Sequence, residues 1–502
     1  MNEMTRIAAQ PAYSEAVQAF LKRAPKLFID GEWVDSTHGT TIAVFDPSTG
    51  KEIARVVDAS DADVDRAVAA ARRAFDDGRW SGLPSYKREQ IINRLADLVE
   101  AATPEIAEIE SVDNGKPRMA SQGYDLPNCV QSLRYNAGWA TKLSGEHLEP
   151  AGFATGAMHA YVRREPVGVA ALIVPWNFPL MMAIQKIAPA LAAGCTIVLK
   201  PAEQTPLSAL RFADLLAEAG IPAGVVNVIT GNGETAGDRM VRSPDVDKVA
   251  FTGSTEVGKL INRAATDTLK RVTLELGGKS PVIVLPDVDI QKTARGAATS
   301  IFSNSGQVCI AGSRLFAHRD IFDSLLEAVA SNASQWKVGP SLDPNTRMGP
   351  LVSTEQHERV LSYIEAGRQE GASVLCGGDA PGGEGYFVNP TILVDVKPEM
   401  KVVREEIFGP VLAATRYDDL DEVAKAANDT SYGLAASIWT RDVSAMHKLA
   451  AKLKAGMVWG NCPSAADVTL PFGGYKQSGF GRESARYGVE TYTELKTVAI
   501  AL

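Results

Sequence analysis

Residues 168–206 read GVAALIVPWNFPLMMAIQKIAPALAAGCTIVLKPAEQTP, and this stretch decides the fold class. Its apolar runs at 168–174 and 195–199 are continuous, and residues 180–193 between them have the length of a helix. Continuous apolar strands that alternate with helices are typical of a parallel sheet covered on both faces. Such sheets bind ligands at the carboxyl ends of their strands, so the loops after each run are the candidate functional segments.

The alternation continues beyond this stretch. Further apolar runs are predicted as strands at 225–230, 249–251, 272–276 and 282–285. Helices are predicted at 206–219, 234–241 and 256–265. For the first of these helices we expect Thr205 as the cap, Pro206 at the first helical position and Gly220 just past the end. A second alternation of strands and helices, from about 280 to 483, predicts another α/β unit.

The N-terminal part has a different pattern. Turn signals at Asp30-Gly31 and at 47–50 predict pairs of short strands. A helix is expected from about Ala62, capped by Ser60 or Asp61, and a second long helix at about 87–112. The segment 144–162 and the tail 490–502 look like strands without a partner nearby in sequence, which favours pairing with another subunit.

Composition excludes several classes of protein. The 502 residues carry 51 basic and 60 acidic side chains, a net charge of −9, and no basic block stands out, so we expect no nucleic-acid partner. The five cysteines are widely spaced and the six histidines form no HExxH or His/Cys cluster, which indicates free thiols, a reducing compartment and no metal site. The apolar stretches are too short to span a bilayer and the N-terminus lacks a signal-peptide core, so we expect no membrane association and a cytoplasmic location.

Polar residues follow two of the buried strands. Asn177, in PWNFP, is placed to donate its amide to a developing oxyanion, although a turn-forming Asn beside Pro is the simpler interpretation. Lys200 and Glu203, in KPAEQTP, would project into the crevice, where a carboxylate can accept hydrogen bonds from ribose hydroxyls. A solvated charge pair at the start of a helix is the alternative for these two.

Two further loops carry glycines. The loop FTGSTEVGK (251–259) nearly matches a nucleoside-triphosphate-binding loop, but Leu260 replaces the hydroxyl that would hold magnesium. What remains is a glycine-flanked turn that can place Ser254 and backbone N–H groups on a phosphate. In LELGGKSP, Glu275 lies inside an apolar strand, where burial would raise its pKa and suit it to act as a general base; capping of neighbouring N–H groups is the alternative.

Cys309, in NSGQVCIAGSR, is the candidate nucleophile. A cysteine is most often a small buried hydrophobic residue, and a free thiol is mostly protonated at pH 7, so catalysis needs an activating environment. The other four cysteines lie in or beside strand-like, helical or turn segments that offer no general base.

Together these loops resemble the aldehyde dehydrogenase superfamily, from FIDGEW at residue 28 to the tail. The motifs that match in order and spacing are PWNFPL, AGCTIVLKPAEQTP, FTGSTEVGK, LELGGKSP, GQVCIAGSR, EEIFGPV (405–411) and PFGGYKQSGFGRE (471–483). The resemblance implies NAD as cofactor, an α/β fold with a Rossmann-like parallel-sheet cofactor domain, an α/β catalytic domain and a bridging strand element. The implied boundaries are 1–143 and 163–277 for cofactor binding, 278–485 for catalysis, and 144–162 with 486–502 for bridging and oligomerisation.

The resemblance also assigns roles to residues. It makes Cys309 the nucleophile, Glu275 the general base and Asn177 the oxyanion donor, with Lys186 organising the catalytic water and thioester region. The implied cofactor contacts are Ile173, Val174, Pro175, Trp176, Lys200, Glu203, Gly233, Thr252, Gly253, Ser254, Val257, Gly258, Leu276, Gly277, Glu406 and Phe408. Glu203 would repel a 2′-phosphate, so NAD is preferred over NADP, although Lys200 could neutralise that phosphate.

The implied substrate pocket is roomy and mostly apolar. It comprises Phe178, Met181, Met182, Gln185, Val308, Ile310, Ala466, Val468 and Phe472. This lining favours a medium-chain or arylalkyl aldehyde such as phenylacetaldehyde, and the chain is weakly similar to phenylacetaldehyde dehydrogenases. If Asp467 points inward, betaine aldehyde or an aminoaldehyde is favoured instead. A cysteine esterase without redox chemistry and a non-catalytic structural relative stay open, and the expected assembly is a homo-oligomer, a dimer of dimers.

Overall fold

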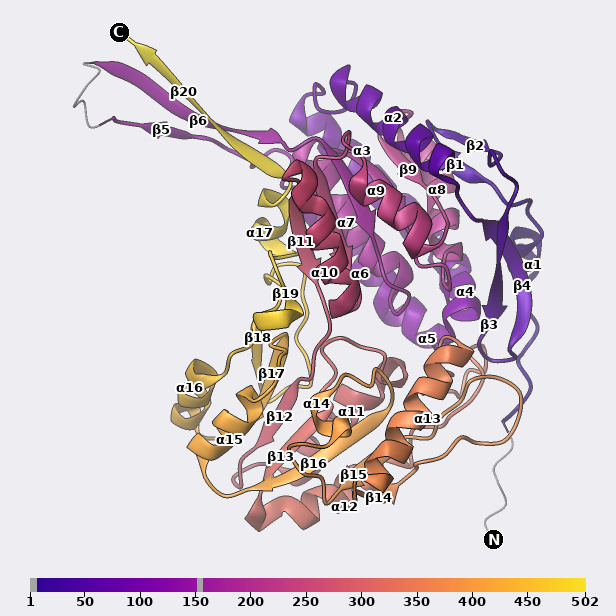
Figure 1. The fold of residues 1–502 in the computed structure, drawn as a ribbon, viewed down its shortest axis with the longest axis vertical. Coiled ribbons are helices and arrows are strands. Elements are labelled where there is room, and N and C mark those ends of the chain that lie inside the picture. The colour runs from indigo at the N-terminus through magenta and orange to yellow at the C-terminus, as the bar shows by residue number, and fades with distance from the viewer. Residues whose placement is uncertain (1–6, 151–156) are drawn as a thin grey trace.

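Four β-sheets organise residues 7–150 and 157–502, which this computed structural model describes (Figure 1). The largest has eight strands in the order β19-β11-β10-β7-β8-β9-β1-β2. Their bounds are β1 Leu27–Ile29, β2 Glu32–Val34, β7 Val169–Ile173, β8 Thr196–Lys200, β9 Val226–Val228, β10 Lys248–Thr252, β11 Arg271–Glu275 and β19 Gly479–Phe480. The strands from β11 to β9 are parallel, so their carboxyl ends meet at one edge of the sheet.

Helices cover both faces of this sheet, where they form two apolar clusters. The helices in this part of the chain are α1 Glu15–Leu21, α2 Asp61–Asp76, α3 Ser85–Ala101, α4 Thr103–Asn114, α5 Arg118–Ala120, α6 Leu126–Ala137, α7 Pro179–Ala193, α8 Leu207–Ala219, α9 Asp238–Arg242 and α10 Thr255–Ala265. Short π-helical turns span Ser121–Asp125 and Gly233–Gly237, and a 3₁₀ turn spans Thr266–Thr268. As predicted, Ser60 caps α2, in a capping box with Asp63. Gly220 ends α8 in the left-handed conformation (φ 94°), as expected of a glycine at that position.

A second sheet has the order β14-β15-β16-β13-β12-β17-β18 and lies in the lower part of Figure 1. Its strands are β12 Pro281–Val284, β13 Arg314–His318, β14 Ser373–Cys376, β15 Thr391–Val394, β16 Val411–Tyr417, β17 Ala435–Trp439 and β18 Met457–Gly460. Its helices are α11 Ile290–Phe302, α12 Phe322–Ala333, α13 Thr354–Gln369, α14 Lys401–Arg404, α15 Leu420–Asn428 and α16 Val443–Lys452, with 3₁₀ turns at Ser303–Gly306 and Arg319–Ile321. All neighbours except β14 and β15 are parallel, which confirms the predicted second α/β unit.

The run at 282–285 falls within the predicted second unit of 280–483, and as β12 it pairs with β13 and β17 in the second sheet. Two expectations about other elements were wrong in detail. The helix expected at 87–112 is two helices, α3 and α4, because Pro104 cannot continue an α-helix through its own position. Pro206 is the N-cap of α8 rather than its first helical residue, and Thr205 instead donates its hydroxyl to the Trp176 carbonyl (3.4 Å).

The remaining strands form two antiparallel sheets. β3 (Thr41–Asp46) and β4 (Lys51–Val57) make the hairpin predicted around residues 47–50. The other antiparallel sheet is an arm that projects from the body and contains β5 (Glu146–Leu148), β6 (Met158–Pro166) and β20 (Thr493–Ala501) (Figure 1). A 3₁₀ turn at Lys476–Ser478 and a short helix α17 (Ala485–Glu490) precede β20 in the chain. β6 pairs along its whole length with β20, so each finds a partner within the chain that the sequence did not reveal. Residues 151–156 of the expected bridging segment, and 1–6 of the N-terminus, lie outside the described residues.

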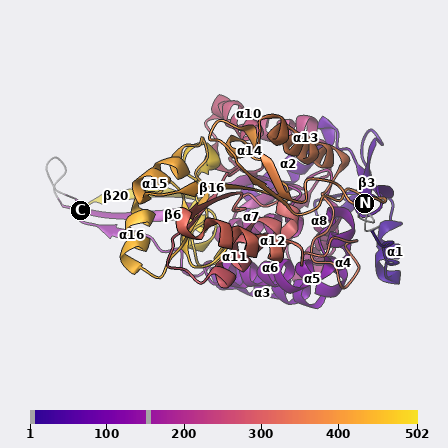
Figure 2. The same cartoon turned by 90° about the horizontal axis from the view of Figure 1, so that it is seen from below.

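The core follows this arrangement. Separate apolar clusters fill the two faces of each large sheet, one of them centred on α3, α6, α7 and α8. Helix α1 and the end of β20 lie at opposite ends of the molecule (Figure 2). Within residues 7–150 and 157–502, no helix combines the length and apolar character needed to cross a membrane.

Candidate active site

The carboxyl ends of five parallel strands bring most of the predicted cofactor contacts together. Residues 173–176 end β7 and follow it, Lys200 ends β8, Gly233 follows β9, Thr252 ends β10 and Leu276 follows β11. In the order β11-β10-β7-β8-β9, β7 lies in the middle. The chain adds β8 and β9 on one side of β7 and then crosses over to add β10 and β11 on the other side. This reversal of strand order is where open α/β sheets bind ligands.

Glu406 and Phe408 come to the same edge from the segment that precedes β16. The Glu406 Oε1 atom accepts a hydrogen bond from the Gly278 backbone N–H (2.9 Å). A Cβ atom at Gly277 would lie 2.2 Å from Glu406 Oε2, so only glycine allows this approach. The Phe408 ring packs edge-on against Trp176, with 5.2 Å between the ring centroids. The segment between α14 and β16 therefore completes the edge of the first sheet.

The polar groups at this edge fit a dinucleotide. Lys200 Nζ lies 3.2 Å from Glu203 Oε2, and burial lowers the pKa of Lys200. Among the described residues Thr252 Oγ1 is buried without a hydrogen-bond partner, which leaves it free for a ligand. Ser254 caps α10 by accepting from the Val257 N–H (3.2 Å), and the N-terminus of that helix favours an anion such as a phosphate. Gly258 lies against Leu276, where a Cβ atom would come within 2.6 Å.

Cys309 lies on the other side of this edge, at a cavity of about 400 Å³ between the two sheets. All nine predicted pocket residues line this cavity together with Cys309: Phe178, Met181, Met182, Gln185, Val308, Ile310, Ala466, Val468 and Phe472. They come from α7, the loop before β13 and the loop after β18. The structure thus brings together side chains that the sequence places almost 300 residues apart.

The surroundings of Cys309 favour its protonated thiol over the thiolate. Burial, with repulsion by Glu406 and Glu275, raises its pKa to about 12. The loop that leads to it contains Asn304 and Ser305 in the left-handed conformation (φ 47° and 55°). Such residues cost free energy and persist where surrounding contacts fix them. Here Ser305 Oγ donates to the Gly349 carbonyl (2.7 Å).

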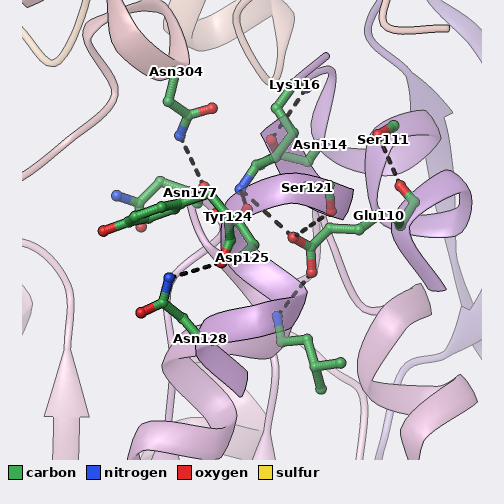
Figure 3. A network of polar contacts seen from close by, with 12 residues as sticks. Glu110, Ser111, Asn114, Lys116, Ser121, Tyr124, Asp125, Asn128, Asn177 and Asn304 are labelled. Atoms are coloured by element: carbon green, nitrogen blue, oxygen red, sulfur yellow. Dashed lines mark hydrogen bonds and ion pairs between the residues drawn. The ribbon is translucent and has the colours of Figure 1, made fainter. Parts of the chain in front are cut away.

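Asn177 is tied to this loop in two directions. Its side-chain nitrogen donates to the Gln307 carbonyl (2.8 Å), two residues before Cys309. Its own carbonyl accepts from the Asn304 side-chain nitrogen (2.9 Å), as Figure 3 shows. An amide nitrogen carries two N–H groups, so one bond to Gln307 leaves a second donor.

Glu275 ends β11 as a buried carboxylate. Neither of its oxygens has a hydrogen-bond partner among the described residues. Burial and repulsion by Glu483 raise its pKa well above the ordinary value, while Lys186 and Arg482 oppose this shift. Lys186, predicted to organise this region, forms a buried ion pair with Glu483. The sequence analysis gave Glu483 no role, and its position at the end of a glycine-rich motif was the only signal.

The sequence analysis also missed one wall of the cavity. Lys116, Ala120, Tyr124 and Asp125 line it from the segment between α4 and α6, and Asn128 lines it from the first turn of α6. Lys116 and Asp125 are buried and paired, with 2.5 Å between Nζ and Oδ2 (Figure 3). The sequence around Lys116 and Asp125 has the pattern of an ordinary helical region. Only the presence of charged residues in that region could have indicated that they line a cavity.

Asp467 lines the cavity as an ionised carboxylate that is exposed to solvent. Its side chain is exposed, and its Oδ1 atom accepts from the backbone N–H (2.8 Å) and the hydroxyl (2.5 Å) of Thr469. These hydrogen bonds lower its pKa. The hydrogen bonds of Asp467 therefore lie within its own loop.

Comparison with known proteins identifies the family. The model of the aldehyde dehydrogenase family matches residues 33–498. The chain belongs to this family. The aldehyde dehydrogenase is therefore an NAD⁺-dependent oxidoreductase that acts on aldehydes, and the resemblance seen in its motifs is confirmed.

Relatives and solved structures agree with this assignment. The chain is 47% identical over 505 residues to the phenylacetaldehyde dehydrogenase of Pseudomonas fluorescens, covering 99% of this chain and 100% of that protein. The NAD⁺ complex of the aldehyde dehydrogenase from Bacillus cereus superimposes with a TM-score of 0.96 at 46% identity, covering 98% of this chain and 100% of that one. An indole-3-acetaldehyde dehydrogenase of P. syringae, solved with NAD⁺, gives a TM-score of 0.94 at 44% identity, covering 97% and 98%. These likenesses confirm the predicted fold and NAD as the cofactor.

Proposed function

We propose that this aldehyde dehydrogenase oxidises its substrate through a thioester on Cys309. As the Cys309 sulfur adds to the aldehyde carbon, the thiol proton is released to water and the carbonyl oxygen becomes an oxyanion. Asn177 and the Cys309 backbone N–H donate to that oxyanion; loss of one such donor typically raises a barrier by ~3 kcal/mol. The support is the anchoring of Asn177 to the loop of Cys309 through Gln307.

The second half of the proposed reaction is hydrolysis. The residues at the strand ends would hold NAD⁺, which would supply the hydride acceptor for the oxidation of the aldehyde carbon. Glu275 then takes a proton from the water that attacks the thioester, which releases the carboxylic acid and the Cys309 thiol. Lys186 helps to organise this region, and its ion pair with Glu483 supports that role. A coenzyme A-acylating relative would not need this base, so Glu275 favours the free acid as product.

We propose a medium-chain or arylalkyl aldehyde, such as phenylacetaldehyde, as the substrate. One observation carries this proposal: the cavity at Cys309 has a volume of about 400 Å³ and largely apolar walls, with Gln185 and Ala466 where bulkier side chains would narrow it. The name of the Pseudomonas fluorescens relative points the same way. Betaine aldehyde and aminoaldehydes are less favoured, because the charge of Asp467 is exposed to solvent, which screens it, and Asp125 is paired with Lys116.

The test is a panel of phenylacetaldehyde, hexanal, acetaldehyde, betaine aldehyde and an aminoaldehyde, compared by kcat/KM with NAD⁺. We expect phenylacetaldehyde or hexanal to rank first. Acetaldehyde or betaine aldehyde in first place would overturn the substrate proposal. Hydrolysis of esters without any aldehyde-dependent reduction of NAD⁺ would favour a cysteine esterase instead.

Assembly is a separate proposal. We propose a homo-oligomer, a dimer of dimers, built through the arm of β5, β6 and β20. In the described chain, β5 and β20 are the edges of this sheet, and Leu495 and Ile500 on β20 are exposed. The division into cofactor, catalytic and bridging parts at 1–143 with 163–277, 278–485, and 144–162 with 486–502 is proposed on the same basis, and the cytoplasmic location stays a prediction. A monomer by light scattering at micromolar concentration would contradict the proposed assembly.

A further inference from the structure

Four buried ionisable side chains behind the cavity have no part in the proposed chemistry. They are Glu110, Asp113, Lys116 and Asp125, each at most 3% exposed. A buried charge costs free energy unless it is paired or hydrogen-bonded. The partners of these four groups therefore indicate what they stabilise.

Glu110, near the end of α4, contacts the start of α7. Its Oε2 atom accepts from the backbone N–H of Leu180 (3.1 Å), in the first turn of α7 and three residues after Asn177. Its Oε1 atom accepts from Ser121 Oγ (3.3 Å) and lies 3.6 Å from Lys116 Nζ. Figure 3 shows this carboxylate between the two segments. The N-terminal N–H groups of a helix have no partner within the helix, so a carboxylate placed there fixes where the helix begins.

The same end of α4 holds the other neighbours of Asn177. Asn114 Nδ2 donates to the Trp176 carbonyl (2.6 Å). The Lys116 ammonium lies 4.3 Å from the centroid of the Phe178 ring. The residues on both sides of Asn177 are thus held by α4 and the residues that follow it, whereas the Asn177 side chain itself points to the loop of Cys309.

We propose that Glu110 is a positioning residue that keeps Asn177 in place as the oxyanion donor. It acts by fixing Leu180, and with it the turn from Asn177 into α7. Misplacement of a donor by about 1 Å can cost a factor of about 100 in rate. This inference rests on the proposed oxyanion role of Asn177.

The chain offers a matched control. Asp113 lies on the same helix, is equally buried, and accepts from the backbone N–H of Leu207 (3.0 Å) at the start of α8. It therefore makes the same kind of contact to a different helix. A purely structural effect of neutralising a buried carboxylate on α4 should therefore appear in both Glu110→Gln and Asp113→Asn.

The experiment separates the effect of the length of the Glu110 side chain from the effect of its charge. Glu110→Gln keeps an acceptor at the same reach without the charge, whereas Glu110→Asp keeps the charge facing Lys116 and withdraws the oxygen from Leu180. For both variants and for Asp113→Asn, kcat and KM are measured with phenylacetaldehyde. The rate of p-nitrophenyl acetate hydrolysis is measured as well, because this reaction needs the oxyanion donor but no hydride transfer. NAD⁺ binding and thermal unfolding report whether each variant is folded.

We expect Glu110→Asp to lower kcat and the ester rate in parallel, by about 10-fold, with KM changed less than about 3-fold. Glu110→Gln and Asp113→Asn should stay within about 3-fold of the wild type. In an Asn177→Ala background, Glu110→Asp should have no further effect, because the donor that it positions is gone.

Two results would overturn the inference. One is an effect that follows the charge, in which Glu110→Gln loses kcat and Glu110→Asp keeps it. The other is a loss of kcat in Glu110→Asp that is equally large with Asn177 present and in the Asn177→Ala background. An Asn177→Ala variant with the kcat of the wild type would instead overturn the oxyanion role itself, and this outcome is visible without any Glu110 variant.

Discussion

The two sides of Cys309 are built in different ways. On the cofactor side, polar groups stand at the carboxyl ends of five neighbouring parallel strands, and Glu406 is joined to them by one hydrogen bond to Gly278. On the substrate side, the cavity walls come from α7, from the segment between α4 and α6, and from the loops before β13 and after β18. The first arrangement depends on strand ends that one sheet aligns, and the second depends on side chains from separate segments. Changes on the cofactor side should therefore affect every aldehyde, whereas changes in the cavity should affect the choice among aldehydes.

The largest effect is expected at Glu275. Glu275→Gln should lower steady-state kcat by about 10²–10³-fold for every aldehyde, because deacylation loses its base. A burst of NADH equal to the enzyme concentration should precede the stall, and stopped-flow absorbance measures it. Full turnover without a burst would show that another group is the base. It would contradict the proposal that Glu275, at the end of β11, deprotonates the attacking water.

The same residue predicts the pH dependence. The pKa of Glu275 is raised in the folded protein, so the ionised base is scarce at low pH and kcat should rise with pH through that pKa. For stability the sign is opposite: the folded state holds this proton above the unfolded pKa of about 4.3, so the contribution of Glu275 to stability falls as the pH rises. Glu275→Gln should therefore unfold at a higher temperature than the wild type at pH 8, and by a smaller margin at pH 5, as measured by differential scanning calorimetry.

An intermediate effect is expected at Gln185 in the cavity. Gln185→Trp fills space beside Met181 and should lower kcat/KM for phenylacetaldehyde about 10- to 100-fold by steric exclusion. Acetaldehyde should be oxidised within about 3-fold of the wild-type rate, and it serves as the internal control. A uniform loss with both aldehydes would mean that the cavity and the reactive centre are not separable in this way.

The smallest effect is expected at Glu203. Glu203→Ser removes the carboxylate that pairs with Lys200 (3.2 Å) and should raise kcat/KM for NADP⁺ about 10-fold, a gain of roughly 1.4 kcal/mol from lost repulsion. The exposed Glu218 on α8 is the control, and Glu218→Gln should leave both cofactors unaffected. Unchanged discrimination in Glu203→Ser would show that Glu203 does not face the 2′ position. The profile across aldehydes should stay the same in either case.

Much of the cofactor side could be predicted from the sequence. The runs at 168–174, 195–199 and 249–251 are strands β7, β8 and β10, because a strand buried on both faces leaves a continuous apolar run. Glu275 stood out because a carboxylate inside such a run is costly. The run at 282–285 follows the strands of the first sheet in sequence and also begins the predicted second unit, because its pattern marks a buried strand without saying which sheet receives it; β12 lies in the second sheet.

The sequence by itself determined the local elements, the strand ends that carry Asn177, Lys200 and Glu275, and the family to which their motifs belong. Tertiary structure alone decided that β6 pairs with β20 across more than 300 residues, that Lys116 and Asp125 form a wall of the cavity, and that Glu110 meets the start of α7. The physical reason is range. Periodicity, capping and turn chemistry act between residues a few positions apart and are written in the sequence, whereas a buried ion pair or a cavity wall exists only where packing brings distant segments together.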